Sequence, residues 1–256
     1  MKVTVCELPN EPPALDRAWA SLVEHARSAG SDLVVLPEMP FHRWLAHTDD
    51  VRESEWLAAV AAHDEWLERL DETGALVVGT RPVVEHRVRR NAGYIKEPGG
   101  GVRIVHHKYY LPDEPGFWEA SWYSRGDGDF SVVQTSYGRL GMLICTELWF
   151  GRHARDYAGQ GIQLLACPRA TPNSHPDKWI AGGRAAAVVS GAFCLSSNLS
   201  GTTPQGGDYA GKGWVIHPEE GEILGLTSRE APFLTVEIDL DAADRAKHTY
   251  PRYVNA

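Results

Sequence analysis

Long apolar runs are missing from this chain of 256 residues. No segment approaches the roughly 20 consecutive apolar residues that a membrane-spanning helix needs. The first residues, MKVTVCELP, have the composition of a β-strand and lack the charged start and apolar core of a secretion signal. The sequence therefore predicts a cytoplasmic protein that has no membrane among its partners.

Positive charge is also in short supply. Lys and Arg number 25 against 34 Asp and Glu, which gives a formal net charge of -9. Nucleic acids and anionic membranes are bound mainly through Lys and Arg, because both present negative phosphates. We therefore expect no nucleic-acid partner, and the acidic balance favours solubility.

Cysteine and the spaced patterns that bind metals are scarce as well. No two cysteines have CxxC spacing and no HExxH sequence occurs, so neither a zinc site nor a small disulfide framework is indicated. We expect no metal, no cofactor, and free thiols in a reducing compartment. The chain has four cysteines, namely Cys6, Cys145, Cys167 and Cys194.

What the sequence has is an alternation of short apolar runs with segments of helical periodicity. The apolar runs predict strands buried on both faces and occur at 3–8, 33–38, 75–80, 141–147, 163–168 and 193–198. Helical periodicity covers 14–29, 54–71, 152–160 and 177–190, and turn signals predict hairpins at 91–108 and 211–226. Because no linker interrupts the pattern, we expect one α/β domain over 1–256, with a tail from about residue 248 that packs on a partner subunit.

Cys145 differs from the other three cysteines in its position along the chain. It ends the apolar run GMLIC and is followed at once by polar Thr146 and Glu147. The carboxyl ends of strands in α/β sheets face the crevice where active sites are built. A cysteine with strand residues on both sides is ordinarily a core residue. Cys145 is therefore the candidate nucleophile, and the other three are expected in the core.

Glu38 and Lys108 occupy similar points, at the ends of the runs LVVLPE and VRIVHHK. A carboxylate at the end of a buried strand is suited to proton transfer. An ammonium there can stabilise an oxyanion and lower the pKa of a nearby thiol. Each of them alone is more often a solvated surface charge, so the prediction of a site depends on their combination.

The ordered set Glu38, Lys108, Glu119 and Cys145 resembles the nitrilase superfamily of carbon-nitrogen hydrolases. LVVLPE is similar to the first-glutamate motif of that family, HHKYYLP to its lysine motif, and GRLGMLICTELWF to its nucleophile motif. FWEASWYSRGD resembles the segment that supplies a second glutamate. The likeness continues to the closing FLTVEIDL, so the motifs are in register over nearly the whole chain.

This resemblance implies a fold and a chemistry. The fold is a four-layer αββα sandwich, with two sheets face to face and helices outside. Cys145 would form a thioester with the substrate while Glu38 transfers protons. Lys108 would stabilise the oxyanion, and Glu119 would hold Lys108 or position the substrate. Members of the family commonly pair, so we expect a homodimer or a higher homo-oligomer.

Three local features bear on the subfamily and on rival functions. The family commonly has Phe-Pro-Glu after the nucleophile, where this chain has Phe150-Gly151-Arg152. It often has Glu-Asn in the helix around Arg184, where this chain has Val189-Ser190. Residues 206–213 nearly spell a phosphate loop, but Gly213 stands where a magnesium-binding Ser or Thr is needed, so a hairpin is expected there.

Substrate contacts are expected from residues close in sequence to the catalytic set. The ordinary role of a tryptophan is core packing, but several of them near one site indicate a pocket for a flat or apolar substrate. The candidates for substrate binding are Trp44, Trp122, Trp149 and Thr146.

The predicted function is hydrolysis of a small amide or N-carbamoyl compound with water. A nitrile substrate is one alternative, although Thr146 follows the nucleophile where true nitrilases resemble this sequence but carry Trp. Transfer of the acyl group to an amine is another. A nucleotide-binding protein and a non-catalytic scaffold are alternatives from other classes, and the presence of Glu38, Lys108 and Cys145 argues against the scaffold.

Overall fold

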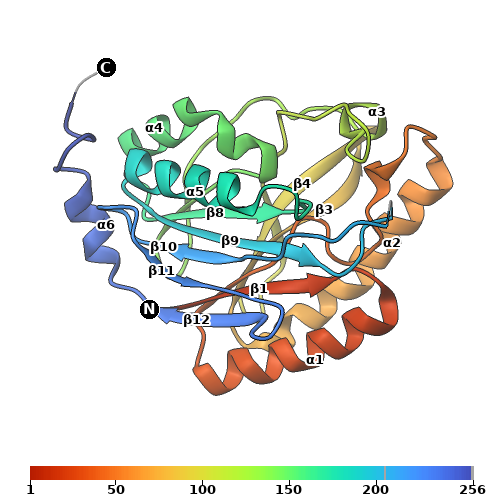
Figure 1. Ribbon diagram of the computed structural model, residues 1–256, viewed down its shortest axis with the longest axis horizontal. Coiled ribbons are helices and arrows are strands. Elements are labelled where there is room, and N and C mark those ends of the chain that lie inside the picture. Colours follow the sequence, from red (N-terminus) through yellow and green to blue (C-terminus); the bar gives the residue numbers. More distant parts are fainter. Residues whose placement is uncertain (205, 255–256) are drawn as a thin grey trace.

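Two β-sheets joined at one strand form the frame of the molecule (Figure 1). A computed structural model describes residues 1–204 and 206–254. One sheet has the order β5-β4-β3-β2-β1, and the other has the order β9-β8-β7-β6 with β10 and β11 beyond β9. The strands are β1 (Lys2–Pro9), β2 (Leu33–Val35), β3 (Leu76–Glu85), β4 (Val88–Lys96), β5 (Val102–His107), β6 (Val133–Gln134), β7 (Arg139–Met142), β8 (Leu164–Arg169), β9 (Phe193–Ser200), β10 (Trp214–Ile216), β11 (Ile223–Leu226) and β12 (Phe233–Glu237).

The joint between the two sheets is β1. Along one edge, its residues Lys2 to Cys6 pair antiparallel with β12, and its last residues, Glu7 to Pro9, pair parallel with β9. Its residues Val3 and Thr4 pair parallel with β2. The same strand therefore belongs to the first sheet at its start and to the second sheet at its end.

The predicted alternation of strands and helices is confirmed. Each of the predicted apolar runs overlaps a strand, and both predicted hairpins are antiparallel pairs, β4 with β5 and β10 with β11. The four predicted helical segments are α1 (Pro12–Ala29), α2 (Glu53–Arg69), α4 (Gly151–Gly159) and α5 (Pro176–Ser190). Two short helices, α3 (Glu119–Trp122) and α6 (Leu240–Ala246), lie outside the predicted segments.

Helix α1 illustrates how the sequence sets these boundaries. Prolines occupy its first turn, where a missing N–H costs nothing, and Gly30 ends it in the left-handed conformation at φ 67°. Its buried residues Leu15, Trp19, Leu22 and Ala26 recur at helical spacing and make one apolar face. That face packs against the first sheet, because the same core cluster contains Val34 and Val77 from β2 and β3.

Three apolar layers show that the fold is a four-layer αββα sandwich, as predicted. One layer lies between the first sheet and α1, and a second lies between the other sheet and the pair α4 and α5. The third combines Val5 and Val35 from the first sheet with Leu164 and Leu195 from the second, so it fills the space between the sheets. Figure 1 shows α4 and α5 above the strands and α1 below them.

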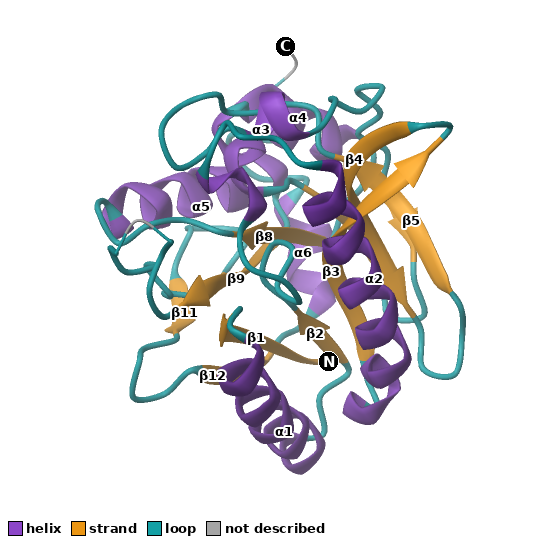
Figure 2. Ribbon diagram, turned by 90° about the vertical axis from the view of Figure 1, so that its right-hand side faces the viewer, coloured by secondary structure: helices purple, strands orange, loops and turns teal. Residues whose placement is uncertain are grey.

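The two sheets approach each other closely where β4 faces β7. A Cβ atom on Gly93 of β4 would lie 2.2 Å from Sδ of Met142 on β7, so only glycine leaves room for this methionine. In the turned view of Figure 2, β3, β4 and β5 stand beside α2. This close approach brings the ends of β5 and β7, and with them Lys108 and Cys145, toward one another.

The segment after α6 contacts its own chain. Nε of Arg252 donates to the carbonyl of Ala246, and its Nη2 lies 2.9 Å from Oε2 of Glu219. The side chains of Tyr250 and Tyr253 are exposed. Packing of this tail on a partner subunit stays a prediction, since Arg252 is held within the subunit. In the described part of the chain, the helices are too short or too polar to span a membrane.

Candidate active site

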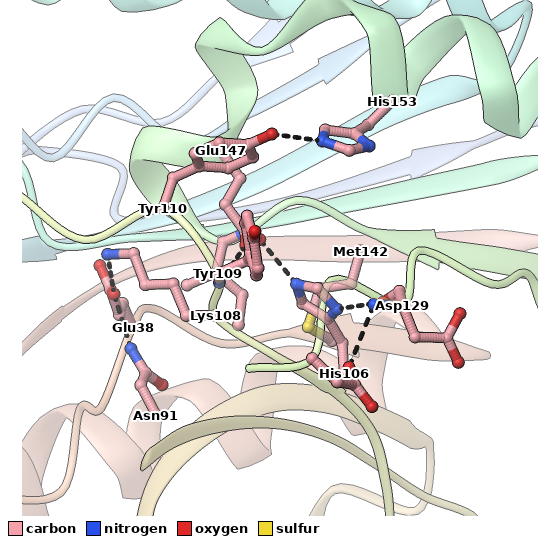
Figure 3. Close-up of polar contacts among 12 residues, drawn as sticks. Glu38, Asn91, His106, Lys108, Tyr109, Tyr110, Asp129, Met142, Glu147 and His153 are labelled. Carbon is pink, nitrogen blue, oxygen red and sulfur yellow. Dashed lines mark hydrogen bonds and ion pairs between the residues drawn. The ribbon is translucent and has the colours of Figure 1, made fainter. Parts of the chain in front are cut away.

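Glu38 follows β2 and is fully buried. Its Oε1 accepts hydrogen bonds from Nζ of Lys108 and from Nδ2 of Asn91, each at 2.8 Å (Figure 3). Its Oε2 is buried and has no hydrogen-bond partner among residues 1–204 and 206–254. A buried carboxylate oxygen without a donor is costly, and it is free to accept a proton.

Lys108 follows β5 and lies between two carboxylates. Its Nζ is 2.8 Å from Oε1 of Glu38 and 2.6 Å from Oε2 of Glu119, and all three side chains are buried. Burial alone would lower the pKa of Lys108, but the charges of Glu119 and Glu38 outweigh it, and the net pKa is raised. Lys108 is therefore a permanent ammonium at neutral pH.

Glu119 is the first residue of α3 and completes this charge cluster. Its Oε2 also accepts a hydrogen bond from the hydroxyl of Tyr123. Burial raises the pKa of Glu119 from 4.5 to about 7, opposed by Lys108 and assisted by the negative charge of Glu38. Glu119, buried beside a second carboxylate, thus holds a proton more tightly than it would in water.

Cys145 does not end a strand, which corrects one detail of the sequence prediction. Strand β7 stops at Met142, and Cys145 begins a 3-10 turn over Cys145–Trp149 with φ 49°. A non-glycine residue in this left-handed region costs on the order of 1–3 kcal/mol, and such strain collects at functional sites. In this turn the thiol makes a hydrogen bond with the backbone of Ala170 and interacts electrostatically with Glu38, Lys108 and Glu119.

The electrostatics of Cys145 also differ from the simplest expectation. Burial raises its pKa, Glu38 and Glu119 raise it further, and the lowering by Lys108 is not enough to offset them. The resting side chain is therefore a neutral thiol. A nucleophile in this state needs a base at the moment of attack, and the unbonded Oε2 of Glu38 is the group available.

Access to the thiol comes through a cavity of about 180 Å³. Cys145, Thr146, Trp149 and Trp179 are among its lining residues. It adjoins a wider cavity of about 800 Å³, because Thr146, Trp149 and Trp179 line both. Although Cys145 is only 4% exposed, a small substrate thus has a route to it.

The four predicted substrate-binding residues divide into two pairs. Thr146 and Trp149 line the cavity beside Cys145. Trp44 and Trp122 are 2% exposed and belong to a core cluster, where their indole N–H groups donate to the carbonyls of Gly116 and Thr48. The indole N–H groups of these two tryptophans are thus hydrogen-bonded to carbonyls inside the protein, and their contacts are structural. A role for them in binding substrate stays a prediction.

Asn91 is a site residue that the sequence did not single out. It lies on β4, and besides its bond to Glu38 its carbonyl accepts the backbone N–H of Lys108 at 2.9 Å. A polar residue in the first strand of the predicted hairpin was the available signal. The prediction of no metal stays untested, and among the described residues no three His, Cys, Asp or Glu side chains form a group that would hold one.

The four-layer sandwich and the buried charge cluster beside a cysteine are the features expected of the nitrilase superfamily class. Comparison with protein families agrees, since the family model described as carbon-nitrogen hydrolase matches residues 2–248. The chain belongs to the carbon-nitrogen hydrolase family.

Known relatives lie at a distance. The chain is 27% identical to omega-amidase NIT2-A from Xenopus laevis, over 93% of this chain and 87% of that protein. It is 29% identical to N-carbamoylputrescine amidase from Solanum tuberosum, where the match covers 58% of this chain and 54% of the relative, about half its length. A crystal structure of a carbon-nitrogen hydrolase from Helicobacter pylori G27 superposes with a TM-score of 0.87 at 22% identity, covering 98% of this chain and 94% of the other, which shows the shared fold.

Proposed function

We propose that this chain hydrolyses a non-peptide carbon-nitrogen bond of a small amide or N-carbamoyl compound through a thioester on Cys145. The observation that carries the proposal is the unbonded, buried Oε2 of Glu38 in a cluster whose charges act on the Cys145 thiol. The names of the relatives, an omega-amidase and an N-carbamoylputrescine amidase, support the substrate class. The proposal includes a single domain over 1–256 that works in the cytoplasm as a homo-oligomer.

In the first step the thiol adds to the substrate carbonyl. The sulfur of Cys145 forms a bond to the carbonyl carbon as Oε2 of Glu38 takes the thiol proton. The carbonyl oxygen becomes an oxyanion, and the ammonium of Lys108 lies in the same cluster to stabilise it. Because the thiol starts neutral and gives up its proton as the sulfur attacks, this is a general-base step.

In the second step the carbon-nitrogen bond breaks. Glu38 returns the proton to the departing nitrogen, which leaves as ammonia or an amine, and the acyl or carbamoyl group remains on sulfur as a thioester. Lys108 keeps its charge throughout, because Glu38 and Glu119 hold its pKa above the ordinary value. Glu119 contributes by holding Lys108 in place at 2.6 Å.

In the third step water replaces the amine. Glu38 takes a proton from water while the hydroxyl adds to the thioester carbon, and collapse of this adduct breaks the carbon-sulfur bond and returns the proton to Cys145. The product is a carboxylic acid, or carbamate when the substrate is an N-carbamoyl compound. The three steps use groups of this chain and no cofactor.

The test is ammonia release from a panel of small amides, N-carbamoyl compounds and nitriles. Wild-type protein should act on at least one amide or N-carbamoyl compound, and a protein mass increased by the acyl group should appear during turnover. Cys145→Ala should fold, release no ammonia and show no added mass. Turnover by Cys145→Ala would end the proposal, and a preference for added hydroxylamine over water would favour acyl transfer.

A further inference from the structure

A second buried ion pair lies close in sequence to the catalytic residues. The side chain of Glu147 has no exposed surface, and its Oε2 lies 2.8 Å from Nε2 of His106. Glu147 comes from the turn that begins with Cys145, and His106 comes from β5, two residues before Lys108. In Figure 3 His106 stands between Glu147 and Asp129. The proposed steps use neither side chain.

The carboxylate of Glu147 binds the backbone beside both catalytic residues. Its Oε2 accepts the N–H of Ile144, the residue before Cys145, at 2.7 Å. Its Oε1 accepts the N–H of Tyr109, the residue after Lys108, at 2.7 Å. One rigid group thus connects the nucleophile turn to the lysine loop across 38 positions of sequence.

The hydrogen bonds of His106 determine its protonation state. Nδ1 lies 3.0 Å from the carbonyl oxygen of Asp129, which can only accept, so Nδ1 carries a proton. Nε2 faces Oε2 of Glu147, and each oxygen of that carboxylate already accepts a backbone N–H. With acceptors on both sides, both nitrogens of the ring carry protons.

We propose that the Glu147 carboxylate and the His106 imidazolium form a positioning clamp that fixes the distance between Cys145 and Lys108. The clamp holds a turn whose first residue is strained, at φ 49°. Glu147 and His106 are positioning residues, since neither lines the cavity beside Cys145. The effects on kcat depend on the proposed function, whereas the Glu147–His106 contact itself does not.

The clamp gives the enzyme a dependence on pH. Burial would lower the pKa of His106, but the charge and hydrogen bond of Glu147 outweigh it, and the pKa is raised. Asp127 also favours the imidazolium, whereas His153 interacts with both members of the pair. Because the folded-state pKa is raised, the clamp is complete at low pH and is lost as pH rises through that pKa.

Two variants separate the clamp from its charge. The Glu147 carboxylate faces three N–H donors, from Ile144, Tyr109 and His106. In Glu147→Gln at least one of them meets an amide NH2 instead of an oxygen. We expect kcat to fall about 100-fold with KM nearly unchanged, because the reacting groups are slightly misplaced. His106→Gln keeps one donor and loses the charge, so kcat should fall about tenfold. The alkaline limb that His106 causes in wild type should disappear from its pH profile.

The matched control is His107→Gln. His107 is the next residue on β5, and its Nε2 lies 2.9 Å from Glu85 rather than near Glu147. This variant should keep the wild-type kcat and the wild-type pH profile. If Glu147→Gln fails to fold, the comparison of His106→Gln with His107→Gln still decides.

A measurement without substrate tests the charge directly. In protein with 15N-labelled histidine, NMR should show two protonated ring nitrogens for His106 at neutral pH and loss of one of them in alkaline solution. A single ring proton at neutral pH, or His106→Gln with wild-type kcat and pH profile, would overturn the clamp. Turnover by Cys145→Ala with a doubly protonated His106 would instead remove the proposed function and leave the ion pair standing.

Discussion

Replacing Lys108 by Met gives the sharpest test of the charge cluster. Methionine keeps most of the apolar stem but removes the ammonium that lies 2.8 Å from Glu38 and 2.6 Å from Glu119. Two buried carboxylates then face each other without a counter-ion. Removing one partner of a buried ion pair costs about 3–5 kcal/mol, a large share of the roughly 5–15 kcal/mol by which a typical domain is folded.

The same substitution should abolish efficient turnover for a separate reason. Loss of one group that stabilises an oxyanion lowers kcat by about 10²–10³. The double variant Lys108→Met, Glu119→Gln removes one of the two uncompensated charges. It should recover most of the lost stability and none of the lost activity, because the oxyanion still has no ammonium.

Urea unfolding followed by tryptophan fluorescence measures the first effect, and ammonia release measures the second. The single variant Glu119→Gln is the control for the amide itself. If Lys108→Met is as stable as wild type, the cluster is not held by ion pairing. If the double variant regains activity, Lys108 acts only as a structural counter-ion and the assignment of the oxyanion partner is wrong.

Three further outcomes follow from the same contacts. Asn91→Ala removes the 2.8 Å hydrogen bond to Glu38 and should lower the free energy of unfolding by about 1–3 kcal/mol together with kcat; unchanged kcat would show that Glu38 needs no such support. The pKa of Glu119 is raised from 4.5 to about 7, so the folded state holds the proton of this carboxyl group more tightly than the unfolded chain does. The stabilisation that comes from protonated Glu119 is therefore complete below pH 4.5 and is lost as pH rises through 7. That loss is about 3 kcal/mol in urea titrations of wild type, and it should vanish in Glu119→Gln; an identical pH dependence in both proteins would contradict the shift. Trp149→Ala, in the cavity wall, should raise KM with little loss of stability, whereas Trp44→Ala, in the core, should cost about 3–5 kcal/mol in thermal unfolding; the reverse pattern would return substrate binding to Trp44.

The parts of the site that the sequence predicts are those with a local signal. Glu38 follows a strand that the apolar pattern marks, Lys108 ends the predicted hairpin 91–108, and the structure brings both of them to Cys145. The strand before Cys145 is shorter than predicted, because the apolar Leu143 and Ile144 continue the pattern into a segment that leaves the sheet after Met142. Apolar composition records burial, and it does not distinguish a strand from the buried backbone that follows it.

The contacts that the sequence does not predict join residues far apart in the chain. Asn91 meets Glu38 across 53 positions, and Glu147 meets His106 across 41. Neither pair has a spacing that marks it. Asn91 and Glu38 meet because β4 and β2 belong to the same sheet, and Glu147 and His106 meet because the two sheets face each other. The tryptophans were noticed in the sequence, but their roles could not be predicted. Several tryptophans near one site indicated a pocket, whereas tertiary packing decides whether an indole faces a cavity or a carbonyl.

The packing between the two sheets has a consequence for altering the enzyme. Glu38 and Lys108 follow strands of one sheet, and Cys145 follows a strand of the other. The side chains packed between the two sheets therefore contribute to the distance of the sulfur from the acid and the ammonium. Val35 and Met142 are among these side chains. Substitutions that change the volume of such interior side chains should change the distance between the two sheets, and with it the distance between the sulfur and the Glu38–Lys108 pair. The reaction rate can therefore be altered without changing a residue of the cavity.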